Sequence, residues 1–135
     1  MIKKINNPEE IQKFLDNCGG SLDTFTYFDQ RPTSIIKNHL LTILAYEDKK
    51  PVAYGHLEKE DNKIWLGICV AEKNQGQGFG KKIMAELLDF ADKNFLEVTL
   101  SVKEHNKRAI SLYTQLNFVP IMVKEKNIFM RRNHG

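Results

Sequence analysis

The chain has 135 residues, of which 41% are hydrophobic and 27% charged, a balance typical of a globular protein with one hydrophobic core. The formal net charge of +3 is small and the lysines are scattered, so we expect no nucleic-acid partner. No apolar run approaches ~18 residues and no apolar segment follows the first lysines, so we expect no membrane span and no signal peptide. These features predict one domain over residues 1–135 of a cytoplasmic protein, with Cys18 and Cys69 as reduced thiols.

The first third of the sequence predicts a short strand, a helix and an irregular segment. Residues 1–5 suit a strand. Asn7 can cap a helix and Pro8 suits its first turn, and the Cys-Gly-Gly stretch that follows ends it. Residues 21–33 are rich in aromatic side chains and show no clear period. The segment TSIIKNHL, residues 33–40, predicts one or two helical turns.

The next third predicts an antiparallel meander. β-branched and aromatic residues dominate the segments 40–47, 52–59 and 63–71, and short polar turns separate them at 48–51 and 59–62. We therefore expect three strands joined by hairpins.

The last part alternates helices and strands. Apolar residues spaced by three and four predict a helix that begins after the glycines at 76–80, and a second helix follows Asn106, which can act as its cap. A strand at 97–103 lies between these helices, and two strands flank a turn at 125–127. The order predicts an α/β fold with a mixed, mostly antiparallel sheet flanked by helices.

Three glycines at alternate positions, Gly76, Gly78 and Gly80, directly precede a helix. A helix N-terminus presents unpaired N–H groups and a partial positive charge, and glycines let an anion approach these amides. Lys81 and Lys82 in the first turn oppose the helix dipole, which is reasonable if a phosphate lies nearby. We therefore predict a phosphate-binding loop.

Two common phosphate motifs do not fit. A dinucleotide fingerprint starting at Gly76 requires a glycine at position 81, which is Lys81. A P-loop requires glycine at position 75 and serine or threonine at position 82, where Gln75 and Lys82 stand. These mismatches argue against a nucleotide-binding domain for NAD or ATP.

A third pattern, Q-x-x-G-x-G from Gln75 to Gly80, resembles the acetyl-CoA loop of the GCN5-related N-acetyltransferase (GNAT) family. The preceding strand IWLGICV resembles the family's fourth strand. The segment NKRAISLYTQLNF, residues 106–118, resembles the family pattern N-x-x-A-x-x-L-Y-x-x-x-G-F, with Asn117 in place of the glycine. Asn and Gly both tolerate the left-handed end of a helix. The resemblance covers residues 64–118 and implies a single acetyltransferase domain.

The resemblance implies that acetyl-CoA is the co-substrate and lies between two parallel strands, 63–71 and 97–103, that splay apart. An amine would attack the thioester directly, and Tyr113 would protonate the departing thiolate. The implied cofactor-binding residues are the backbone of Ile68, Cys69 and Val70 for pantetheine, the loop residues Gln75, Gly76, Gln77, Gly78, Phe79, Gly80 and Lys81 for the pyrophosphate, and Asn106.

Several side chains are candidates for the proton acceptor and the acceptor pocket. His56 and Glu58 share one face of a strand, and either could take the amine's proton. His39 is a further candidate, which we place with Tyr27 and Arg31 in the acceptor pocket. The aromatic and charged side chains around Tyr27 suit a polar, ring-bearing substrate such as an amino sugar.

We therefore predict an N-acetyltransferase that moves an acetyl group from acetyl-CoA to a primary amine of a small molecule such as an amino sugar. The alternative is a catalytically weak CoA-binding sensor of the same fold. We expect no metal ion, and the chain as a monomer or a homodimer. Protein N-termini, lysines, polyamines and aminoglycosides also remain open as acceptors.

Overall fold

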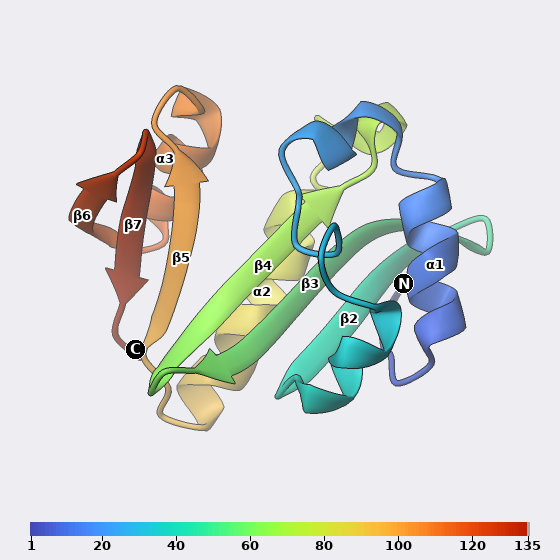
Figure 1. The fold of residues 1–135 in the computed structure, drawn as a ribbon, viewed down its shortest axis with the longest axis horizontal. Coiled ribbons are helices and arrows are strands. Elements are labelled where there is room, and N and C mark those ends of the chain that lie inside the picture. The colour runs from blue at the N-terminus through green and yellow to red at the C-terminus, as the bar shows by residue number, and fades with distance from the viewer. Residues whose placement is uncertain (135) are drawn as a thin grey trace.

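The computed structural model describes residues 1–134. Seven strands form one sheet in the order β1-β2-β3-β4-β5-β7-β6 (Figure 1). The strands are β1 (Ile2–Lys4), β2 (Leu41–Glu47), β3 (Lys50–Glu60), β4 (Lys63–Val70), β5 (Val98–Lys103), β6 (Val119–Lys124) and β7 (Asn127–Arg132). The helices are α1 (Pro8–Asp16), α2 (Phe79–Lys93) and α3 (Lys107–Gln115), with short 3₁₀ helices η1 (Gly19–Asp23), η2 (Thr33–Asn38) and η3 (Glu72–Asn74). The predicted α/β class and the element order are confirmed.

The strands of the meander are joined by tighter turns than the sequence predicted. Asp48 and Lys49 alone connect β2 to β3, with φ angles of 51° and 68°. Asp61 and Asn62 alone connect β3 to β4, with φ angles of 53° and 62°. Two successive residues with positive φ match the right-handed twist of a hairpin. As a result β3 begins at Lys50, two residues before its expected start.

The parallel pair β4–β5 separates soon after it starts. Only Ile64 with Val98 and Trp65 with Thr99 are paired, and beyond them the two strands diverge (Figure 1). β5 stays paired with β7 along its whole length, and β4 with β3. The divergence therefore opens the middle of the sheet and leaves both halves intact, as expected for a splayed pair.

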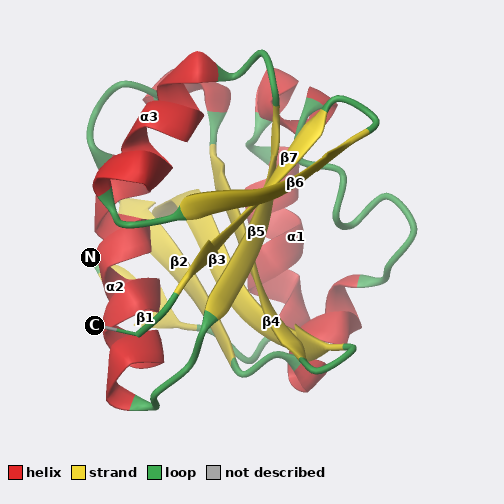
Figure 2. Cartoon of the chain, turned by 90° about the vertical axis from the view of Figure 1, so that its left-hand side faces the viewer, coloured by secondary structure: helices red, strands yellow, loops and turns green. Residues whose placement is uncertain are grey.

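Helices cover both faces of the sheet (Figure 2). The apolar side of α2 packs on one face, and Gly55 of β3 makes room for it, because a Cβ there would lie 2.5 Å from Cγ2 of Ile83. On the opposite face Ile11 and Phe14 of α1 pack with Tyr54. Two hydrophobic clusters therefore pack against β2 to β4, one on each face of the sheet.

The helix ends follow the sequence with small shifts. Asn7 caps α1 by accepting a hydrogen bond from the Glu9 N–H at 2.9 Å, and the helix ends at Asp16, before the predicted Cys-Gly-Gly end. Asn106 caps α3 in the same way. Tyr113 is the buried residue of α3, and the apolar residues beside it are half-buried because this helix borders a cavity. Among residues 1–134, no helix is long and apolar enough to cross a membrane.

Candidate active site

A cavity of about 1030 Å³ occupies the opening between β4 and β5. Its walls come from η1 and the segment after it, from the divergent halves of β4 and β5, from the glycine loop and from α3. The residues predicted from sequence that line it are Tyr27, Ile68, Cys69, Val70, Gln75, Gly76, Gly78, Phe79, Gly80, Lys81, Asn106 and Tyr113. The glycine loop and the splayed strands therefore share one site.

The glycine loop leaves the start of α2 bare. Gly76 and Gly78 have φ angles of 79° and 89°, in the left-handed region that glycine favours. Gly78 is the N-cap residue of α2, and no side chain caps this helix. A Cβ at Gly78 would meet no heavy atom within 4 Å. Phe79, Gly80 and Lys81 of the first turn line the cavity, and their N–H groups have no hydrogen-bond acceptor among the described residues. Such free amides at a helix N-terminus can bind a phosphate.

Two cationic side chains border this loop. Lys81 lines the cavity, whereas the ammonium of Lys82 lies over the Phe79 ring, 5.6 Å from its centroid. Besides Lys81, Arg108 of α3 borders the loop, because its Nη2 is 3.8 Å from where a Cβ at Gly76 would lie. Arg108 was not predicted, because an exposed arginine in the first turn of a helix looks like any solvated residue. Its position two residues after Asn106 was the available signal.

The two glutamines of the loop behave differently. Gln75 Nε2 donates to Ser21 Oγ at 3.0 Å, and that hydroxyl donates to the carbonyl of Val70 at 2.6 Å. Gln77 Nε2 donates to the carbonyl of Lys73, and Gln77 does not line the cavity. Gln75 therefore ties the glycine loop to η1 and to the end of β4.

The divergent half of β4 supplies backbone rather than reactive side chains. Ile68, Cys69 and Val70 lie beyond its last pair with β5, so their edge toward the opening has no strand partner within the described chain. The Cys69 side chain is buried beside Cys18, and the hydrogen bond between the thiols, together with burial, raises the pKa of Cys69. This edge can pair with an extended ligand, as strand addition requires.

Tyr113 reaches the cavity from α3. It is 8% exposed, its ring packs on Phe118, and burial raises its pKa to about 12. Among the residues that the structure describes, its hydroxyl has no hydrogen-bond partner. The phenol is therefore protonated at neutral pH and free to donate into the cavity.

On the opposite side of the cavity, Tyr27 joins a hydrogen-bonded group. Its hydroxyl donates to Glu58 Oε1 at 2.8 Å and lies 2.7 Å from His39 Nε2. The other ring nitrogen of His39 lies 2.8 Å from Thr42 Oγ1. Burial, together with the charge of Arg31, lowers the pKa of His39 to about 4. The imidazole is therefore neutral at physiological pH.

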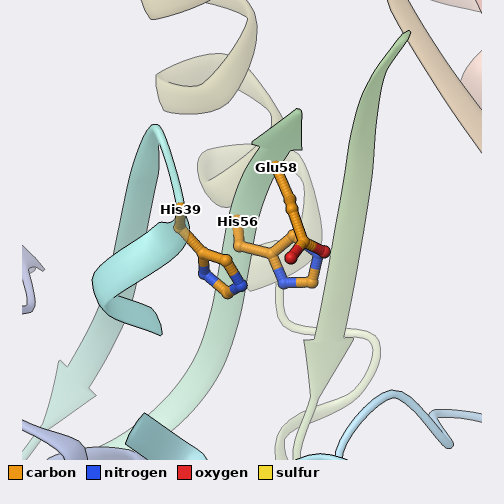
Figure 3. A group of neighbouring side chains, drawn as sticks. All are labelled: His39, His56 and Glu58. Atoms are coloured by element: carbon orange, nitrogen blue, oxygen red, sulfur yellow. The ribbon is translucent and has the colours of Figure 1, made fainter. Parts of the chain in front are cut away.

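His56 completes this group from the middle of β3 (Figure 3). Its ring centroid is 4.4 Å from those of Tyr27 and His39, and Nδ1 lies 2.5 Å from the Tyr54 hydroxyl. Burial first, and then the neighbouring His39, keep the pKa of His56 well below its usual value. Tyr27 lines the cavity, whereas His39, His56 and Glu58 lie behind it.

Arg31 covers this group from the solvent side. Its guanidinium lies over the Tyr27 ring, 4.3 Å from the centroid, and Nη1 donates to the Tyr27 carbonyl at 2.8 Å. Arg31 does not line the cavity. It holds Tyr27 in place and adds positive charge beside it.

His39, His56 and Glu58 also offer a set of metal-ligand atoms, which lie within 4.8 Å of one another. In a tetrahedral zinc site, bonds of about 2.0–2.2 Å bring ligand atoms to about 3.4 Å. The Tyr27 hydroxyl already bonds two of these three side chains. The group is thus arranged as a hydrogen-bonded network around that hydroxyl.

Comparison with known proteins supports one family. Residues 8–118 match the model of the acetyltransferase (GNAT) family. Among curated proteins, none matches this sequence.

Solved structures share the fold at low sequence identity. A PaiA N-acetyltransferase from Thermoplasma acidophilum, in complex with coenzyme A, is 16% identical with a TM-score of 0.78, over 99% of both chains. The ribosomal-protein-S18-alanine N-acetyltransferase of Escherichia coli is 19% identical with a TM-score of 0.73, over 98% of this chain and 92% of that one. A phosphinothricin acetyltransferase from Sinorhizobium meliloti, in complex with AcCoA, is 14% identical with a TM-score of 0.76, over 100% and 88%.

Proposed function

The chain belongs to the GNAT acetyltransferase family and is an acyl-CoA-dependent N-acetyltransferase with acetyl-CoA as its co-substrate, and we propose that its acceptor is a primary amine of a small molecule. One observation carries the assignment. A bare helix N-terminus, a free strand edge and an unpartnered buried tyrosine line the same cavity. A phosphate-bearing thioester needs these three features for its pyrophosphate, its pantetheine arm and its leaving sulfur.

We assign the cofactor contacts to the backbone of the loop and of β4. The N–H groups that open α2 would hold the pyrophosphate, with Lys81 and Arg108 adding positive charge. The backbone of Ile68 to Val70 would pair with pantetheine. Asn106, which caps α3 at the cavity wall, is the proposed contact from the far side.

We propose a direct transfer without a covalent enzyme intermediate. The amine attacks the thioester carbonyl, and Tyr113 protonates the sulfur as the C–S bond breaks. The raised pKa of Tyr113 keeps the proton on this phenol until a thiolate forms beside it. Of the two base candidates, Glu58 is the better proton acceptor, since burial disfavours the charged form of His56.

The proposed acceptor site is the wall of the cavity around Tyr27. The named acceptors of the similar structures differ, from a ribosomal-protein alanine to phosphinothricin, so the fold does not select one. An amino sugar would suit the polar, aromatic wall around Tyr27. If Arg31 shapes this wall, Arg31→Ala raises the KM for the amine and leaves the Kd for acetyl-CoA unchanged. Unaltered amine kinetics would remove Arg31 from the acceptor site.

Calorimetric titration with acetyl-CoA, with NAD and ATP as controls, is the first test. Micromolar affinity for acetyl-CoA alone supports the site, and CoA release is then measured with an amino sugar, a polyamine, an aminoglycoside, free lysine and an alanine-starting peptide. Turnover of one amine supports the enzyme. Binding with no turnover of any amine would favour the alternative, a CoA-binding sensor, whose base lies buried behind Tyr27. Equal binding of NAD or ATP would reject the assignment of the loop.

We also propose the domain organisation, the oligomeric state and the compartment of the chain. Residues 1–135 would form a single acetyltransferase domain, as a monomer or a homodimer. The two free thiols, Cys18 and Cys69, fit a reducing compartment such as the cytoplasm.

A further inference from the structure

We propose that Tyr27 is a catalytic residue, which takes a proton from the acceptor's ammonium and passes its own proton to Glu58. The inference rests on the proposed function, because it needs an amine acceptor in the cavity. It differs from the expectation that Tyr27 only lines the acceptor pocket. It also explains how a carboxylate behind the cavity wall can act as a base.

Tyr27 lies between the cavity and Glu58. It lines the cavity, while Glu58 is 9% exposed and does not line it. The 2.8 Å hydrogen bond from the Tyr27 hydroxyl is the direct link between the carboxylate and the cavity wall. A proton leaving the acceptor for Glu58 by this link must pass through the hydroxyl.

The Tyr27 hydroxyl also has one hydrogen-bonding position left for the acceptor. A phenol has one proton to donate and two lone pairs. The proton goes to Glu58 Oε1. One lone pair accepts from His39 Nε2–H, a tautomer assigned because the Thr42 hydroxyl can donate to Nδ1. One lone pair remains to accept a proton from the cavity.

The charges around Tyr27 explain why the transfer must be concerted. Burial, and then the neighbouring carboxylate, raise the pKa of Tyr27, so a free phenolate does not form. Arg31 over the ring acts in the opposite direction, and Glu60 adds a weaker negative influence. His39 and His56 are neutral. The Glu58 carboxylate is therefore the end point to which the proton moves.

The proton balance of the reaction is then complete. The ammonium R–NH₃⁺ gives one proton to the Tyr27 oxygen as the Tyr27 proton moves to Glu58, which leaves a neutral amine. The amine nitrogen forms the bond to the thioester carbonyl carbon and the C–S bond breaks, with its electron pair on sulfur. Tyr113 protonates the sulfur and recovers the proton that the nitrogen loses. The products are the amide, the free thiol of CoA and a protonated Glu58, which then releases its proton to solvent.

The test is Tyr27→Phe, which keeps the ring and removes the hydroxyl. The assay uses whichever of the amines named above the wild-type protein acetylates fastest. We expect kcat at pH 7 to fall about a hundredfold, which is the low end of the rate contribution of a general acid or base. The loss should shrink as the pH approaches the pKa of the amine, because more acceptor then arrives without its extra proton. The Kd for acetyl-CoA should not change.

Tyr46→Phe is the matched control. Tyr46 also donates to a glutamate, Glu10 Oε1, at 2.6 Å, and burial also raises its pKa, but it lies outside the cavity. We expect Tyr46→Phe to keep the wild-type kcat and pH profile. If it loses as much activity as Tyr27→Phe, the effect is structural and the relay is wrong.

Glu58→Gln, alone and combined with Tyr27→Phe, tests whether the two residues act together. Because the relay makes Tyr27 and Glu58 one unit, the double variant should be no slower than the slower single variant. The relay would be wrong if the kcat losses of the two single variants multiplied in the double variant, or if Tyr27→Phe kept the wild-type kcat at pH 7. Turnover by the wild-type protein would still support the acetyltransferase activity in either case. A wild type that acetylates no amine would instead reject the proposed acceptor class, and the relay with it.

Discussion

Gly67 of β4 faces the imidazole of His56 across the β3–β4 ladder, where the two residues are paired. A Cβ at Gly67 would lie 2.4 Å from Cε1 and 2.6 Å from Nε2 of His56. The nearer distance is 1.0 Å short of the 3.4 Å at which ordinary contact begins. His56 is 2% exposed and its Nδ1 is held by Tyr54. Gly67→Ala therefore forces a buried, hydrogen-bonded ring to move by about 1 Å.

Overpacking of this kind costs about 1–3 kcal/mol of unfolding free energy, and urea denaturation of Gly67→Ala should show a loss in this range. The control is Gly55→Ala, whose Cβ would lie 2.5 Å from Cγ2 of Ile83 on the opposite face of the sheet. It should cost a similar free energy. Only Gly67→Ala should shift the NMR signals of the His56 ring. Wild-type stability of Gly67→Ala, with unshifted ring signals, would refute the close approach and the packing of this group.

Three further predictions concern the cavity and the histidines. Tyr113→Phe should lower kcat at least tenfold, or about 1.4 kcal/mol, with an unchanged Kd for acetyl-CoA by calorimetry; a near-normal kcat would leave Tyr113 as packing. Arg108→Ala should weaken acetyl-CoA binding about tenfold, because one charge-assisted contact worth about 1.5 kcal/mol is lost. Arg131→Ala on β7 should leave the Kd unchanged, and an equal rise of Kd in both variants would mean a general effect of net charge. Unfolded His39 takes up a proton near pH 6.5 but the folded residue only near 4, so the unfolding free energy should fall from pH 6.5 to 4. Urea titrations at pH 7 and 5 measure that fall, and His39→Asn should reduce it.

The sequence was sufficient for the parts of the site that are local in the chain. Alternate glycines before an apolar helix predict a bare helix N-terminus, and the cap at Asn106 follows from its position before an apolar helical pattern. The mixed sheet follows from the order of the elements, because hairpins give antiparallel pairs and helical crossovers give parallel ones. The loop and the cap depend on neighbours within a few residues, and the sheet on the order of the elements.

The parts that join distant segments could not be predicted. Tyr27 and Glu58 are 31 residues apart in sequence, and residues 21–33 have no periodicity that would orient Tyr27. The hydrogen bond from Gln75 to Ser21 spans 54 residues. The turns at Asp48-Lys49 and Asp61-Asn62 lack the glycine that marks most such hairpins, so their length was overestimated. In each case the backbone had to be folded before the partner of the side chain could be known.

The surroundings of two tyrosine hydroxyls account for the two proton transfers that we propose in one cavity. Tyr27 and Tyr113 line it from different elements, and burial raises the pKa of both. They differ in what lies behind the hydroxyl. Tyr27 donates to Glu58, so a proton that reaches Tyr27 can move on to a carboxylate. The Tyr113 hydroxyl has no partner among residues 1–134, so its proton can be given only to the cavity. We therefore propose opposite roles for two groups of the same chemical type because their environments differ, and exchanging those environments should exchange the direction of proton transfer.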